Sequence, residues 1–140
     1  MSQAVPYVVF TGGEPLLQLD SALIATLHSE GFEVAVETNG TMPSPAGIDW
    51  LCVSPKGRNP LAITQGDELK LVYPQADALP EQFTHLAFKH FFLQPIDLSA
   101  VAHAQIATDR ADIMKATTAF CMANPQWRLS LQTHKIAGFE

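Results

Sequence analysis

The feature that most constrains this 140-residue sequence is its series of short apolar runs, each followed by a polar or glycine-rich segment. Such runs are typical of strands buried on both faces of a parallel sheet. We expect strands at residues 7–10, 32–38, 49–55, 68–74, 85–95 and 127–133. The connections are long or helical. The pattern therefore predicts a single α/β domain, residues 1–140, with mostly parallel strands.

Two connections have a helical pattern. Asp20 is a candidate cap for a helix that places Leu23, Ile24 and Leu27 on one face and ends at Gly31. Asp109 is the candidate cap of a second, longer helix that ends at Asn124-Pro125. Its expected inner stripe consists of Ile113, Thr117, Phe120 and Cys121.

Polar clusters follow the strands where each one ends. They are found at residues 11–15, 37–41, 54–56, 94–97 and 132–135. In a parallel sheet or barrel these carboxyl ends share one rim, where ligands bind because the loops converge there. We therefore expect a binding site on this rim.

Composition limits the function. The net charge is −6 with only eight Lys and Arg, which argues against broad nucleic-acid binding. No apolar stretch approaches the roughly 20 residues of a membrane span, and the start "MSQAVPYVVFTGG" has no basic signal-peptide region. We therefore expect a cytoplasmic protein. Cys52 and Cys121 are far apart, form no metal motif and are expected to be buried as small hydrophobic residues.

The rim residues suggest particular contacts. Gly12 and Gly13 expose backbone that a ligand can approach, and the Glu14 carboxylate suits an ammonium group; a solvated turn is the alternative. Lys56 suits a carboxylate or phosphate, unless it is merely solvated. The Gln94 amide can read a donor–acceptor edge such as that of a purine.

Other rim residues have equally plain alternatives. Glu37 ends an apolar strand and would point along the rim, or it is a surface carboxylate. Asp97 is either a site residue or a turn residue. Ser130, Gln132 and His134 alternate and would face one way on a strand, although a lone histidine is more often structural.

Five motifs, taken in their order along the chain, resemble those of the 7-carboxy-7-deazaguanine synthases. These are radical S-adenosylmethionine enzymes of queuosine-precursor biosynthesis. The motifs are "TGGEP", "ETNGT", "SPK", "LQP" and "RLSLQTHK". The resemblance implies an incomplete radical-S-adenosylmethionine-type partial barrel and a homodimer. It also implies conversion of 6-carboxy-5,6,7,8-tetrahydropterin to 7-carboxy-7-deazaguanine, with S-adenosylmethionine, a [4Fe-4S] cluster and Mg²⁺.

By this resemblance, the site residues form two groups, one for the cofactor and one for the pterin. The cofactor side would consist of Gly12, Gly13, Glu14, Ser54, Pro55, Lys56, Gln94, Pro95, Ile96 and Asp97. The pterin side would consist of Thr11, Glu37, Gln132, His134 and Glu140, the last through its terminal carboxylate.

One departure from the family is large. The family binds its cluster with three cysteines in a loop after the first barrel strand, and neither Cys52 nor Cys121 matches them. We therefore expect the first strand and the cluster ligands to be missing, and this chain alone to be unable to hold the cluster. The alternatives are a non-catalytic truncated remnant of the family or another radical S-adenosylmethionine enzyme.

Overall fold

The computed structural model describes residues 5–97 and 106–138. Within them, six strands form one sheet in sequential order. The strands are β1 (Tyr7–Phe10), β2 (Glu33–Thr38), β3 (Trp50–Val53), β4 (Gln65–Tyr73), β5 (Ala87–Pro95) and β6 (Trp127–Leu129). Every neighbouring pair is parallel. The predicted α/β fold is thus confirmed, with an all-parallel sheet.

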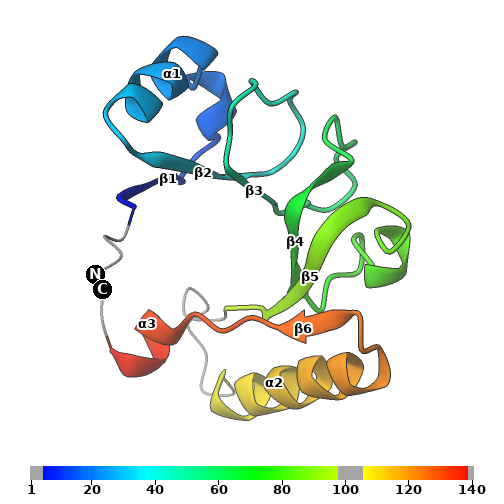
Figure 1. Ribbon diagram of the computed structural model, residues 1–140. Coiled ribbons are helices and arrows are strands. Elements are labelled where there is room, and N and C mark those ends of the chain that lie inside the picture. Colours follow the sequence, from blue (N-terminus) through cyan, green and yellow to red (C-terminus); the bar gives the residue numbers. More distant parts are fainter. Residues whose placement is uncertain (1–4, 98–105, 139–140) are drawn as a thin grey trace.

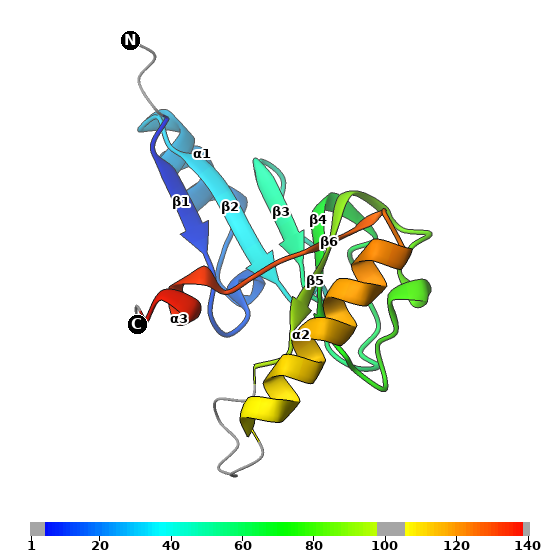
Figure 2. The ribbon, with the colours of Figure 1, turned by 90° about the horizontal axis from the view of Figure 1, so that it is seen from below.

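Two helices, α1 (Ser21–Ser29) and α2 (Ile106–Ala123), connect strands and lie on one side of the sheet (Figure 1), whereas the short α3 (Thr133–Ala137) follows the last strand. Two 3₁₀ turns are η1 (Pro15–Leu17) and η2 (Pro80–Gln82). Figure 1 shows the strands following an arc with α1 and α2 outside it, and Figure 2 shows α2 running alongside β5 and β6. No helix of the described residues is both long and apolar enough to cross a membrane.

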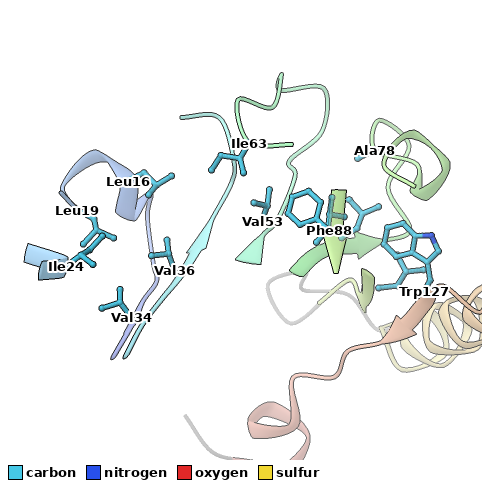
Figure 3. Packing of buried hydrophobic residues seen from close by; sticks show 13 residues of the cluster. Leu16, Leu19, Ile24, Val34, Val36, Val53, Ile63, Ala78, Phe88 and Trp127 are labelled. Atoms are coloured by element: carbon cyan, nitrogen blue, oxygen red, sulfur yellow. The ribbon is translucent and has the colours of Figure 1, made fainter. Parts of the chain in front are cut away.

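The hydrophobic core lies on the outer face of this arc (Figure 3). Val36, Val53, Leu69, Leu71 and Leu93 are completely buried there, in successive strands. Side chains alternate between the faces of a strand, so the residues between these positions point to the inner face. The register pairs Glu37 with Cys52 and Cys52 with Glu68, which makes the inner face partly polar.

The predicted first helix is largely confirmed. The Asp20 Oδ1 atom accepts a hydrogen bond of 2.8 Å from the Leu23 backbone N–H, which caps α1. Gly31 follows the helix with φ +83°, a conformation that glycine adopts at no steric cost. Ile24 is buried, but Leu23 remains 43% exposed, so the apolar face of α1 is narrower than expected.

Asp109 does not cap the long helix. Helix α2 already begins at Ile106, so Asp109 lies in its first turn, where a carboxylate still favours the helix dipole. The predicted end is confirmed, because α2 stops at Ala123 and Asn124 donates a side-chain hydrogen bond of 3.0 Å to the Phe120 carbonyl. Thr117 of the expected stripe is completely buried.

The last strand is much shorter than predicted. Strand β6 ends at Leu129, and the backbone N–H of Ser130 makes a further bond of 2.8 Å to the Leu93 carbonyl. The chain then forms α3, which stops at Gly138 in the left-handed conformation. Ser130, Gln132 and His134 therefore do not share one face of a strand. Their polar alternation indicated a strand only because the short helix has no buried stripe to reveal it.

Candidate functional site

The loops that follow the strands meet at one edge of the sheet, because all strands are parallel. Three hollows lie along this edge. We call them the glycine-loop hollow, the inner-face hollow and the α2–α3 hollow. Together they include most of the residues that the sequence predicted for the site.

The glycine-loop hollow has a volume of about 480 Å³ and contains the loop after β1, from Thr11 to Pro15. Gly12 and Gly13 have positive φ angles of 78° and 43°. A Cβ atom added to either glycine would meet nothing within 4 Å, so the backbone faces open space. The loop therefore offers main-chain groups that a ligand can approach, as expected.

Glu14 is engaged by its own protein. Its Oε1 atom accepts hydrogen bonds from the Thr38 hydroxyl at 2.6 Å and the Leu16 backbone N–H at 3.1 Å. Its Oε2 atom accepts one of 2.9 Å from the Asn39 backbone N–H. The carboxylate thus ties the glycine loop to the turn after β2, which the sequence did not reveal. Each oxygen of a carboxylate can accept a further bond, so a ligand contact remains compatible with this role.

The inner-face hollow has a volume of about 330 Å³, at the lower end of the range for small-molecule sites. It brings together residues from β2, β4, β5, the loop after β3 and the segment from β6 into α3. Its lining consists of Glu37, Ser54, Lys56, Lys70, Val72, Gln94, Ser130, Leu131, Gln132 and His134. Six predicted site residues therefore lie around one cavity.

Lys70 is the charged residue of this cavity that the sequence analysis did not predict. Its Nζ atom lies 3.1 Å from Glu37 Oε1, and its side chain is only 18% exposed. Burial opposes the ammonium form, but the nearby Cys52 sulfur and Glu37 outweigh it, so the pKa of Lys70 is raised. The available signal was a lysine on a central strand at a position that shares the face of Gln94 and Glu37.

Cys52 lies beneath this pair and is 2% exposed. Burial raises the pKa of its thiol to about 12, and the Glu68 and Glu37 carboxylates act in the same direction against the opposing effect of Lys70. A thiol with this pKa is protonated near neutral pH and is therefore a poor nucleophile. The expectation of a buried hydrophobic residue is confirmed for Cys52, whereas Cys121 is only partly buried.

The α2–α3 hollow, of about 640 Å³, contains Pro95, Ile96 and Asp97 from the end of β5. The Lys135 ammonium on α3 pairs with the Asp97 carboxylate. Gln132 lines both this hollow and the inner-face hollow, so the two are adjacent. A ligand could therefore extend from one to the other.

Two predicted residues stand apart. Pro55 is buried and lines none of the three hollows, so its contribution is the shape of the turn between Ser54 and Lys56. Glu140 lies outside the described residues.

The residues do not fit an iron–sulfur cluster. Such a cluster needs three or four thiolates, and the two cysteines of the chain lie on β3 and α2, one of them with a strongly raised pKa. Among the residues described, no group of three or more His, Cys, Asp or Glu could hold a metal ion.

Fold and site together define an α/β protein with an all-parallel sheet and ligand-sized hollows at the carboxyl ends of its strands.

A comparison with the models of known protein families gives no match. Curated relatives are informative. The 7-carboxy-7-deazaguanine synthase of Bordetella pertussis is 62% identical over 94% of this chain and 59% of its own length. That of Caulobacter vibrioides is 54% identical over 94% of this chain and 58% of its own.

A solved structure agrees. The crystal structure of QueE from Escherichia coli matches with a TM-score of 0.65 and 28% identity, over 90% of this chain and 56% of that one. The chain is therefore a homologue of the 7-carboxy-7-deazaguanine synthases. It spans less than two thirds of the length of the relatives that it matches.

Proposed function

We propose that this chain supplies the S-adenosylmethionine-binding and pterin-binding part of a 7-carboxy-7-deazaguanine synthase. The substrate would be 6-carboxy-5,6,7,8-tetrahydropterin, which loses ammonia to give 7-carboxy-7-deazaguanine. The supporting observation is the inner-face hollow, in which Glu37, Gln94 and His134 come from three segments far apart in the sequence. Ordinary strand-ending turns do not require such convergence, whereas a small polar heterocycle does.

S-adenosylmethionine suits the glycine loop. The backbone carbonyls at Gly12 and Gly13 would accept hydrogen bonds from its methionine amino group, since both glycines leave the loop open. Glu14 would add negative charge while bracing the loop through Thr38. Ser54 and Lys56 would contact the ribose and methionine carboxylate, and Gln94 to Asp97 the adenosine side. When bound, the cofactor would supply the 5′-deoxyadenosyl group of the family reaction.

The pterin would lie against the inner face. Glu37 can accept hydrogen bonds from ring and exocyclic N–H groups, and the Gln132 amide can both donate and accept. His134 and Thr11 would add contacts from opposite sides of the rim. Enclosure between the sheet and α3 would limit the access of water to the bound ring.

Radical chemistry needs thiolates that these 140 residues do not contain, because Cys52 and Cys121 cannot hold a cluster together. The same observation favours a second candidate function, a non-catalytic protein that binds the ligands. Mg²⁺ would likewise require ligands beyond those described here, where no three candidate groups come together.

A binding experiment and a chimaera test the proposal. Isothermal titration calorimetry of the chain should detect S-adenosylmethionine and 6-carboxypterin, a stable probe for the substrate. A chimaera with the part of the Bordetella pertussis relative that this chain does not cover should, after reconstitution with iron and sulfide, convert 6-carboxy-5,6,7,8-tetrahydropterin. The intact relative serves as positive control.

The outcomes separate the alternatives. An inactive chimaera beside an active control would reject the synthase and favour the non-catalytic protein. A chimaera that cleaves S-adenosylmethionine without converting the pterin would indicate another radical S-adenosylmethionine enzyme. A homodimer in the cytoplasm is part of the proposal, and light scattering of the purified chain and chimaera tests the dimer.

A further inference from the structure

The position of Lys70 costs folding free energy. Lys70 lies on β4, its side chain is 18% exposed, and its Nζ atom pairs with the Glu37 carboxylate at 3.1 Å. Moving an ammonium out of water costs free energy that a single partner seldom recovers, and an apolar residue of similar volume would often stabilise the fold better. Fold stability alone therefore does not explain a lysine at this position.

The pair belongs to the inner-face hollow. Lys70 and Glu37 both line it, and the Glu37 side chain is 44% exposed. The charge on Lys70 is thus mostly covered, whereas the carboxylate retains access to the cavity. Other charged or titratable groups near the pair are Cys52 on β3, Glu68 on β4, Lys56 after β3 and His134 on α3.

We infer that Lys70 is a positioning residue that fixes the Glu37 carboxylate as an oriented acceptor facing the inner-face hollow. One carboxylate oxygen bonds to Lys70, which leaves the second free to accept from a ligand. An oriented acceptor selects ligands that present N–H donors on one edge, such as the 2-amino and ring N–H groups of a pterin. The inference rests on the proposed function for the identity of this ligand.

Two probes test this selectivity. 6-Carboxypterin carries the 2-amino group, and 6-carboxylumazine has an oxygen in its place. The wild-type chain should bind 6-carboxypterin more tightly. Lys70→Met should weaken the binding of 6-carboxypterin about tenfold, the size expected for the loss of a charged hydrogen bond. It should weaken the binding of 6-carboxylumazine less, because this probe keeps ring N–H groups but lacks the 2-amino group. Lys70→Arg should restore most of the preference, because arginine can still bond to Glu37.

Lys89→Met is the matched control. Lys89 lies on the adjacent strand and pairs with Asp67 at 2.6 Å, but it lines a different hollow. Its loss should leave both dissociation constants within twofold. An equal weakening of both probes by Lys70→Met would overturn the positioning role, and so would an unchanged preference.

A crystal structure of the Lys70→Met variant tests the inference without a ligand. In Lys70→Met the Glu37 side chain should lose its single orientation toward the hollow, while the strands stay in place. Glu37 in the same orientation in the variant would overturn the inference. Failure of the wild-type chain to bind 6-carboxypterin would instead count against the proposed function, and the structure of the variant would still decide the role of Lys70.

Discussion

The Thr38 hydroxyl donates a hydrogen bond of 2.6 Å to the Glu14 carboxylate, which joins the loop after β1 to the end of β2. The Asn39 backbone N–H donates to the second oxygen of the same carboxylate. The glycine loop proposed to hold the cofactor is thus connected through one side chain to the end of β2, next to Glu37, which is proposed to contact the pterin. Changes at Glu14 should therefore affect both.

Glu14→Ala should destabilise the fold and weaken S-adenosylmethionine binding together. It removes the acceptor of three donors, and unpaired donors cost about 1–3 kcal/mol when water cannot replace the partner. Urea denaturation measures the stability and calorimetry the affinity. Glu33→Ala, an exposed carboxylate on the same sheet, is the control. Weaker binding at unchanged stability would instead favour a purely ligand-directed role for Glu14.

His134→Ala should raise the dissociation constant of 6-carboxypterin about tenfold, as expected for the loss of one hydrogen bond. The affinity for S-adenosylmethionine should stay within twofold, because His134 is proposed to contact the pterin and does not line the glycine-loop hollow proposed for the methionine amino group. Calorimetry with both ligands measures the difference. His85→Ala, in an unrelated hollow, should change neither. Equal losses of both ligands would indicate general unfolding.

Gly40→Ala should be strongly destabilising. A Cβ atom there would lie 2.6 Å from Val53 Cγ1, and the φ angle is +77°. Overpacking costs about 1–3 kcal/mol, and the left-handed conformation adds about 1–2 kcal/mol for a residue with a Cβ atom. Gly57→Ala isolates the second cost, since Gly57 has φ +54° and nothing within 4 Å of an added Cβ. Urea midpoints that fall equally in both variants would refute the steric clash.

Cys52 should make stability depend on alkaline pH. Burial raises its pKa from 9.0 to about 12. The unfolded chain therefore loses the thiol proton first, and the stabilisation that is complete below pH 9 is lost as pH rises toward 12. The stability advantage of the wild type over Cys52→Ala should consequently shrink between pH 8 and about pH 11. Denaturation curves at these pH values measure it, and a constant difference would contradict the burial of the thiol.

Asp67 should make the stability of the fold depend on pH in the acid range. Its burial disfavours the carboxylate, but the Lys89 ammonium and the Leu51 backbone N–H outweigh this, so its pKa is lowered below 3.8. The stabilisation is present above this value and is lost as pH falls below it. Asp67→Asn should therefore be less stable than the wild type at pH 6, with a smaller difference at pH 3. Asp77→Asn, from the exposed pair with Arg58, should change little at either pH.

Local sequence patterns predicted most of the fold. The run of valines and aromatic residues Tyr7–Phe10 forms β1 with the predicted bounds, and Asp20 caps α1 as predicted. The errors lie at Asp109 and after Leu129, where the local signals were weak. An aspartate in the first turn of a helix cannot be told from one at the cap by sequence alone. A five-residue helix is too short to show a helical repeat of apolar residues.

The sequence by itself determined the strands, the glycine loop and the polar residues at the strand ends, because these depend on side-chain chemistry and on spacing along the chain. Only the tertiary structure decided which of them meet. Parallel pairing set Glu37, Lys70 and Gln94 around one cavity and directed Glu14 toward Thr38. Register and loop path bring such residues together from distant segments, and no local pattern encodes either one.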